Sequence, residues 1–227
     1  MLWLMIGLVV LMVAQQWYLR GAFFGRKVPR MPCGYKDFLV PVDSYVVYCK
    51  ELEPGPIYGS KKGDGHYIGD VGSPSVLIGF YMTVLDRHFA VAPCDVTLVD
   101  IERWDAGVNL PMLDLLEYTR VMWLHKFDRW MEKHLDGWLT QNERVVLTFE
   151  TGHGWQFKMV LIGDKYVNKI DVFGSVGDKM LGGTTVAYIH RGSQVDLLVP
   201  RNRLHLKQHN NVNKGFRAGD SSLMGEK

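Results

Sequence analysis

Past residue 35, most of this sequence consists of short runs of β-branched and aromatic residues separated by Gly, Pro and Asp. Six such runs lie at 37–49, 75–85, 88–101, 143–151, 154–163 and 184–189. Runs of this length and composition are typical of β-strands, and the residues between them are those that tight turns require. No repeat of 20–50 residues accompanies them. We therefore expect a mainly β (α+β) fold, with a compact β-sheet or barrel-like domain.

One segment breaks this pattern. Residues 110–139, "LPMLDLLEYTRVMWLHKFDRWMEKHLDGWL", place large apolar residues at helical spacing, with Pro111 suited to the start of a helix and Gly137 to its end. Basic residues are interspersed along it. The aromatic stripe is equally compatible with core packing and with an amphipathic helix lying on an anionic membrane. We expect a helical insertion at 105–139 and leave its contacts open.

The N-terminus begins with fourteen uncharged, apolar residues, "MLWLMIGLVVLMVA", continued by "QQWYL". A membrane span needs about 20 such residues, so this segment is of marginal length. No basic region precedes it, which argues against a signal peptide. A basic cluster follows at 20–30, and the positive-inside rule places such a flank on the cytoplasmic face. The sequence predicts a membrane anchor at 1–22, spanning or monotopic, in preference to a buried helix.

Composition limits which functions and which cellular compartments fit this sequence. A net charge of +2 over 227 residues gives no indication of nucleic-acid binding, and no metal-ligand spacing is evident. The three cysteines, Cys33, Cys49 and Cys94, form no CxxC pair, which fits a reducing compartment. We expect three parts: the anchor at 1–22, a β domain at 23–206, and a polar, loosely attached tail at 207–227.

The stretch "VAYIHRGSQVDLLVP" (186–200) contains two strand-like runs joined by residues with too little turn chemistry for a hairpin. A Gly inside such a pattern usually marks a bulge or a close backbone approach. Together with the preceding "GTT", it resembles the closing motif of the small, pyruvoyl-dependent phosphatidylserine decarboxylases, approximately G-E-R-F-G-M-I-R-F-G-S-R-V-D-x-x-x-P. Gly192, Ser193, Val195, Asp196 and Pro200 fall on this motif without a gap.

Other segments resemble the same family in the same order. "FFGRKVPR" is similar to F-F-R-D-P, and "LVPVDSYVV" to S-P-A-D-G-x-V-V. "GFYMTVLDRHFAVAPCDVTLVDI" is similar to I-F-M-S-x-F-D-V-H-x-x-R-A-P-x-D-G-x-V, and "NERVVLTFET" to the N-E-R segment. The resemblance covers roughly 23–103 and 142–201. It implies a mostly β fold, in agreement with the pattern of short runs.

The resemblance also implies self-cleavage between Gly192 and Ser193. Ser193 Oγ attacks the Gly192 carbonyl, and the resulting ester is eliminated to dehydroalanine, which hydrolyses to a pyruvoyl group and ammonia. The products are fragments 1–192 and 193–227. A serine hydroxyl needs a base, usually a histidine oriented by a carboxylate. His88 and Asp43 stand at the matching motif positions and complete the predicted catalytic set with Ser193.

The implied cofactor is therefore a covalent pyruvoyl group derived from Ser193. Such a group condenses with the substrate amine and withdraws electrons as CO₂ leaves. His88 is then the candidate proton donor, because an imidazole gives and takes protons near neutrality. The implied reaction converts phosphatidylserine, or a related aminophospholipid, to phosphatidylethanolamine at the cytoplasmic face of a membrane. A homo-oligomer is left open.

Several positions depart from the family pattern. Ser44 and Val96 replace glycines, Val91 replaces an arginine, and His190 and Arg191 precede the cleavage site where Arg-Phe is usual. These departures leave the lipid substrate open. They also leave two alternatives from other classes: a membrane-tethered, non-catalytic binding module on a carrier-like barrel, and an inactive decarboxylase-like scaffold. His190 is equally compatible with a part in processing and with a place on the strand surface.

Overall fold

The computed structural model describes residues 2–18, 37–58, 67–83, 86–105, 142–164, 170–190, 193–207 and 214–226. Within them the protein is mainly β, with one helix, α1 (Leu2–Trp17). The first strands are β1 (Asp37–Phe38), β2 (Ser44–Leu52), β3 (Gly55–Tyr58), β4 (Tyr67–Val71), β5 (Ser75–Met82), β6 (Phe89–Val91), β7 (Val96–Trp104) and β8 (Arg144–Thr151). They are followed by β9 (Gln156–Gly163), β10 (Ile170–Val172), β11 (Lys179–Met180), β12 (Thr185–Ile189), β13 (Ser193–Pro200), β14 (Leu204–Leu206), β15 (Gly215–Phe216) and β16 (Met224–Glu226).

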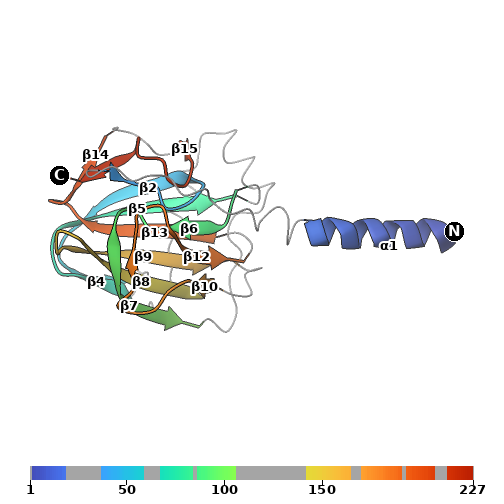
Figure 1. Cartoon of the computed structure of the whole chain (residues 1–227), viewed down its shortest axis with the longest axis horizontal. Helices are drawn as coiled ribbons and strands as arrows, with labels where there is room; N and C mark the ends of the chain where they lie inside the picture. The colour runs from blue at the N-terminus through green and yellow to red at the C-terminus, as the bar shows by residue number, and fades with distance from the viewer. Residues whose placement is uncertain are drawn as a thin grey trace.

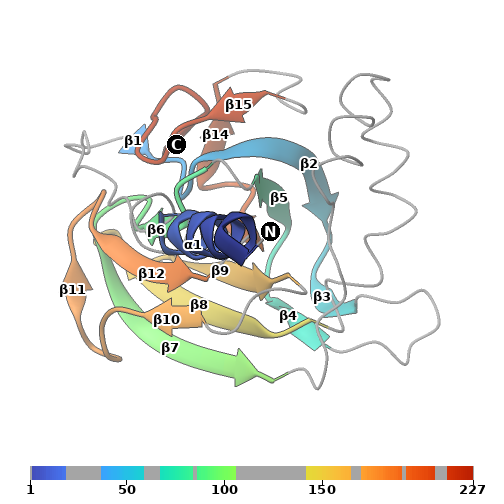
Figure 2. The same ribbon diagram turned by 90° about the vertical axis from the view of Figure 1, so that its right-hand side faces the viewer.

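The strands form one long sheet and three small ones. The long sheet has the order β11-β7-β8-β9-β13-β5-β2-β15, and the small sheets are β10-β12-β6, β1-β16-β14 and β3-β4. Figures 1 and 2 show the β10-β12-β6 sheet lying over one face of the long sheet. Side chains of both sheets share the main hydrophobic core, including Ala90 and Ile189 from one and Leu147 and Val195 from the other. This two-layer packing fixes β12 relative to β13.

Strand β13 lies in the middle of the long sheet, between β5 and β9. Val195, Leu197 and Val199 point into the main core, whereas Leu198 belongs to a second buried cluster on the opposite face. A strand that is buried on both faces consists of nearly continuous apolar residues, which explains the run "VDLLV". The strand that begins at Ser193 is therefore held on both faces and along both edges.

The six strand-like runs of the sequence all form strands, although two of them are divided. The run at 37–49 gives β1 and the start of β2, and the run at 88–101 is divided at its Ala-Pro into β6 and β7. The runs on either side of Gly192 belong to different sheets, as expected from the lack of hairpin turn chemistry. The barrel-like part of the expectation is wrong. Among the described strands the long sheet is open, because its order begins at β11 and ends at β15 without a pairing between them.

The prediction of a loosely attached tail is wrong for residues 214–226. β15 pairs with β2, and β16 pairs with both β1 and β14. Phe216, Leu223 and Met224 are buried in the main core. The polar, Gly-rich composition concealed these three apolar residues, which bury enough surface to fix the segment once strand edges supply backbone partners.

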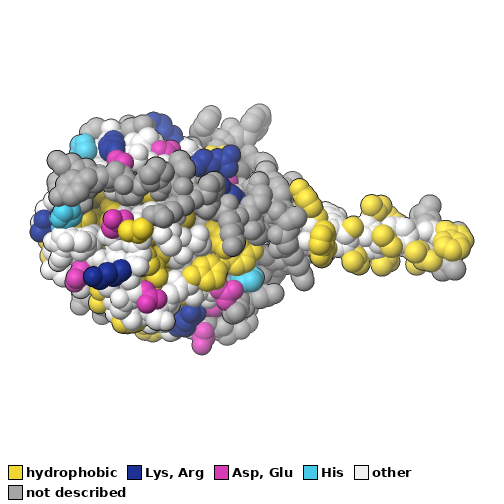
Figure 3. All heavy atoms as spheres, in the orientation of Figure 1, with side chains coloured by type: hydrophobic (Ala, Val, Ile, Leu, Met, Phe, Trp, Pro, Cys, Tyr) yellow, Lys and Arg dark blue, Asp and Glu magenta, His cyan; other side chains and the backbone are white. Residues whose placement is uncertain are grey.

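Helix α1 extends away from the sheets in Figure 1, and hydrophobic side chains cover its visible face in Figure 3. Trp3, Leu11 and Trp17 are among its exposed side chains. No helix in the described part of the chain combines the length and the apolar character needed to cross a bilayer. The predicted helical insertion at 105–139 lies outside the described residues, apart from Asp105 at its edge.

Candidate functional site

The register of four adjacent strands, β9, β13, β5 and β2, brings predicted site residues to one end of the long sheet. Ser193 opens β13, where its Cα partners are Met82 at the end of β5 and Gly163 at the end of β9. On the other side of β5, Tyr45 near the start of β2 pairs with Tyr81. Asp43, directly before β2, therefore lies at the same end as Ser193.

His88 reaches this end through the chain that follows β5. The ring is fully buried, and its Nε2 lies 3.2 Å from the carbonyl oxygen of Thr83. The backbone N–H of Ile189, in the last position of β12, donates to the His88 carbonyl at 3.1 Å. His88 is thus held between the end of β5 and the end of β12, whose last residue, Ile189, precedes Ser193 by four positions.

Asp86 fixes the start of the same segment. Its Oδ2 accepts hydrogen bonds from the backbone N–H of Thr83 at 2.8 Å and from its hydroxyl at 2.7 Å. Burial raises the pKa of Asp86, and the negative charge of Asp43 raises it further, although the bonds from Thr83 act in the opposite direction. The two hydrogen bonds between Thr83 and Asp86 fix the backbone two residues before His88.

Asp43 is fully buried and accepts four hydrogen bonds. Arg87 donates to it through Nε at 2.6 Å and Nη2 at 2.9 Å, Arg217 through Nη1 at 3.3 Å, and the backbone N–H of Ala218 at 2.8 Å. Burial alone would raise the pKa of this carboxyl. The bonds from Arg87 and Ala218 and the charges of both arginines outweigh burial and lower it. Asp43 is therefore a carboxylate held by two guanidinium groups.

The described hydrogen bonds of Asp43 do not include His88, so the orienting role assigned to Asp43 stays a prediction. Sequence reasoning missed Arg87. It stands where the family pattern has Val, while Val91 stands where the pattern has Arg, and this exchange of positions would have indicated it. Arg217 was missed because the tail that carries it was expected to be loose.

The N-E-R segment supports the strand next to Ser193. Asn142 donates through Nδ2 to the Gly163 carbonyl at 2.7 Å, and the Gly163 N–H donates to the Glu143 carbonyl at 2.8 Å. Gly163 is in turn the partner of Ser193 on β9. Arg144 stacks over the Trp104 ring with its Cζ 5.0 Å from the ring centroid, and burial lowers the pKa of its guanidinium.

His190, three residues before Ser193, contacts two side chains of the β10-β12-β6 sheet. Its Nε2 lies 2.8 Å from Asp171 Oδ2, and its ring meets the Tyr188 ring edge-on at a centroid distance of 4.5 Å. The side chain is partly exposed. These contacts order His190 next to the predicted cleavage bond, and its part in processing stays a prediction.

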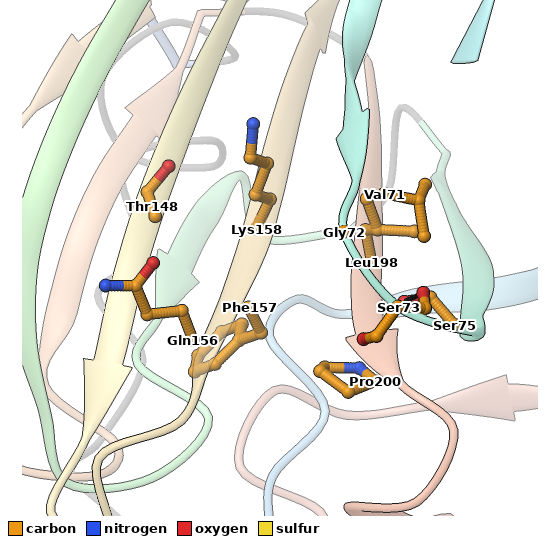
Figure 4. Close-up of a pocket in the computed structure, with 10 residues that line it drawn as sticks. All are labelled: Val71, Gly72, Ser73, Ser75, Thr148, Gln156, Phe157, Lys158, Leu198 and Pro200. Carbon is orange, nitrogen blue, oxygen red and sulfur yellow. Dashed lines mark hydrogen bonds between the residues drawn. The ribbon is translucent and has the colours of Figure 1, made fainter. Parts of the chain in front are cut away.

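A pocket of about 360 Å³ lies at the other end of the long sheet, where Pro200 of β13 pairs with Ser75 of β5. Figure 4 shows Ser73, Ser75 and Pro200 on one side of it, and Thr148, Gln156 and Lys158 on the other. Ser193 is at the opposite end of the same strand. The pocket is therefore separate from the site that the motifs form.

A model of the phosphatidylserine decarboxylase family matches residues 21–227. The chain belongs to the phosphatidylserine decarboxylase family. A curated relative, the phosphatidylserine decarboxylase proenzyme of Mycobacterium avium (strain 104), is 26% identical over 133 residues. The aligned part covers 59% of this chain and 45% of the relative, so the chain spans less than half of the relative's length.

Family membership agrees with the arrangement of the motifs. Segments that are far apart in the sequence, around Asp43, His88, Asn142 and Ser193, meet at one end of one sheet. The match also includes residues 214–226, whose Arg217 and Ala218 bind Asp43. The C-terminal segment is thus part of the family domain and not an appendage.

Proposed function

We propose that this protein is a membrane-associated decarboxylase that converts phosphatidylserine to phosphatidylethanolamine through a pyruvoyl group made from its own Ser193. The observation that carries the proposal is the meeting of the family motifs at the start of β13, within a chain that the family model matches from residue 21 to residue 227. Self-cleavage between Gly192 and Ser193 supplies the reactive group and leaves fragments 1–192 and 193–227.

The described residues fit a pyruvoyl group at position 193. The backbone there is fixed by pairing with both Met82 and Gly163, so a pyruvoyl group at this position would be held at the end of a central strand. When formed, the group supplies an electron sink for the carbanion that decarboxylation generates. Buried apolar side chains of β13 lie on both faces of the long sheet, with Val195 and Leu197 in the main core and Leu198 in the second cluster.

His88 is the proposed proton carrier of the site. Because a carbonyl oxygen only accepts hydrogen bonds, the contact with Thr83 requires the proton on Nε2 and so sets the tautomer of the neutral ring. A histidine in this position can give and take a proton near neutrality. Asp43 and Arg87 hold the adjacent backbone through their paired hydrogen bonds. His88 therefore directly follows Asp86 and Arg87, whose side chains are both held by hydrogen bonds.

Membrane association is proposed from the N-terminal segment. Each large apolar side chain of α1 that enters the bilayer stabilises attachment by roughly 1.5–3 kcal/mol. The basic cluster at 20–30 adds about 1 kcal/mol per charge near an anionic surface. Phosphatidylserine is itself anionic, so the substrate attracts this flank. The positive-inside rule places the domain on the cytoplasmic face.

The test is CO₂ release from phosphatidylserine in vesicles, with the Ser193→Ala variant as control. The wild-type protein is expected to release CO₂ and the variant to release none, because alanine has no hydroxyl from which a pyruvoyl group can form. CO₂ release by Ser193→Ala at the wild-type rate would contradict the pyruvoyl assignment. Release from free serine but not from vesicles would contradict the lipid assignment alone.

A further inference from the structure

Three polar side chains form a buried cluster near the start of β13, two of them on β13 itself and one on β2. Tyr48, Gln194 and Asp196 are 5%, 0% and 1% exposed. The Tyr48 hydroxyl donates to Asp196 Oδ2, while Gln194 Nε2 donates to both the Tyr48 hydroxyl and Asp196 Oδ1 at 2.7 Å. Every member of the cluster therefore contacts the other two, and the Gln194 amide is held in a fork between a hydroxyl and a carboxylate.

A glycine on the intervening strand makes this cluster possible. Tyr48 of β2 and Asp196 of β13 are both Cα partners of Gly79 on β5, so the three residues form one row across three strands. A Cβ at Gly79 would lie 2.5–2.7 Å from three atoms of the Tyr48 ring. The absence of a side chain at Gly79 lets the phenol lie across β5 and reach Asp196.

The charge of the cluster is sensitive to pH near neutrality. Burial raises the pKa of Asp196 to about 7, against the hydrogen bonds from Tyr48 and Gln194 and the charge of Lys50. Burial, followed by the Asp196 charge, raises the pKa of Tyr48 well above its ordinary value. Tyr48 and Lys50 are the titratable groups that β2 presents to Asp196, whereas its partners on β5 and β9 are Gly79 and Val160.

We propose that Tyr48, Gln194 and Asp196 are positioning residues for self-cleavage, which hold the first residues of β13 in the geometry that the Gly192–Ser193 bond requires. The inference rests on the proposed self-cleavage. An ionised Asp196 accepts both hydrogen bonds and fixes Gln194, the neighbour of Ser193. A protonated Asp196 has one fewer strong acceptor, so the hydrogen bonds that hold the Gln194 amide become weaker. Self-cleavage is therefore faster when Asp196 is ionised.

A buried polar cluster of this kind contributes less to stability than well-packed apolar side chains would. Gln194 Oε1 has no hydrogen-bond partner among the described residues, and apolar side chains of the same volume usually stabilise a protein as well as a buried charged group does. What the cluster supplies is a fixed geometry next to the reacting bond, where a displacement of about 1 Å costs roughly 100-fold in rate.

The test uses the full chain made in a short pulse of cell-free translation and then transferred to buffers between pH 6 and pH 9. The appearance of fragment 193–227 gives the rate of self-cleavage at each pH. Tyr48→Phe keeps the ring and removes one donor to Asp196, which raises the pKa of that carboxyl. For Tyr48→Phe we expect self-cleavage at pH 7 to be at least tenfold slower than in the wild type. We also expect the midpoint of the rise in cleavage rate with pH to move to a higher pH. Ser75→Ala, which removes a hydroxyl at the end of β5 opposite Ser193, is the control and is expected to match the wild type.

Asp196→Asn provides an independent variant, because it cannot ionise. We expect slow cleavage at every pH and no step near neutrality, with circular dichroism confirming that the sheet is formed. Wild-type rates in Tyr48→Phe, or a lower rate with an unchanged pH midpoint in both variants, would overturn the positioning role while leaving self-cleavage intact. A wild-type chain that never splits overturns self-cleavage and this inference together.

Discussion

Asp43 joins the two parts of the chain that cleavage would separate. Its partner Arg87 belongs to residues 1–192, whereas Arg217 and Ala218 belong to residues 193–227. A carboxylate that is fully buried among two guanidinium groups and a backbone N–H is stabilised in its charged form. At the scale of single residues, we therefore infer that Asp43 connects the fragments as well as supporting the segment that carries His88.

Asp43→Asn tests this connection. The variant keeps the shape and the acceptor for Ala218 but loses the charge that pairs with Arg87, and removing one partner of a buried ion pair costs about 3–5 kcal/mol. Arg217 is 75% exposed and contributes little to this cost. We expect the free energy of unfolding in urea at pH 7 to fall by about 3 kcal/mol. Asp37→Asn, which removes an exposed pair with Lys207, is the control and is expected to change it little.

The same pair of proteins gives a pH test. The pKa of Asp43 is lowered from its ordinary value of 3.8, so its stabilising contribution is fully present above that value and is lost as the pH falls through the lower, folded-state pKa. The difference between wild type and Asp43→Asn is expected to shrink below about pH 4. A difference that stays constant from pH 7 to pH 3 would show that the charge of Asp43 does not contribute.

At the scale of elements, β5 connects the site to the buried cluster. Its last residue, Met82, is the partner of Ser193, and its Gly79 lies beneath the Tyr48 ring. Gly79→Ala is expected to destabilise the protein by about 1–3 kcal/mol, because the ring is buried and its hydroxyl is engaged. Gly72→Ala is the matched control, since a Cβ there meets no atom within 4 Å.

Thermal unfolding, monitored by circular dichroism, measures the stability of both glycine variants. In a Tyr48→Ala background, the cost of Gly79→Ala is expected to largely disappear, because the ring that the new methyl group meets is absent. Equal costs in the two backgrounds would contradict the contact between β2 and β5 as the cause.

The strands that carry the motifs were predictable because their local pattern and their tertiary environment agree. The run around Val195 is apolar throughout and lies in a strand buried on both faces. β15 and β16 were not predictable, since Phe216 and Met224 stand alone among polar residues and become strands only through pairing with β2, β1 and β14. Local sequence carries no information about such partners.

The candidate site likewise has a part that local motifs predict and a part that depends on contacts between distant segments. Ser193, His88 and Asp43 were predicted from motif positions, and the register of β13, β5 and β2 brings Ser193 and Asp43 to one end of the sheet. The contact of Asp43 with Arg217 depends on chain segments 174 residues apart, which no short motif encodes. The Tyr48–Asp196 contact is likewise a product of strand register across Gly79.

At the scale of the whole molecule, α1 gives the protein an exposed apolar element that no described part of the sheets covers. Deleting residues 1–19 is expected to move most of the protein from the vesicle pellet to the supernatant in co-sedimentation. The remaining binding is expected to weaken with salt, because the basic cluster at 20–30 is left to act alone. Sedimentation that is unchanged by the deletion would contradict the anchor.

The central claim is that the chain cuts itself before Ser193, and intact mass spectrometry of the purified, folded protein tests it most directly. We predict two species, one with the mass of residues 1–192 and one with the mass of residues 193–227 in which a pyruvoyl group replaces the N-terminal serine. Ser193→Ala is predicted to give the single mass of the whole chain. A folded wild-type protein that shows only the uncut mass of residues 1–227 would contradict the account.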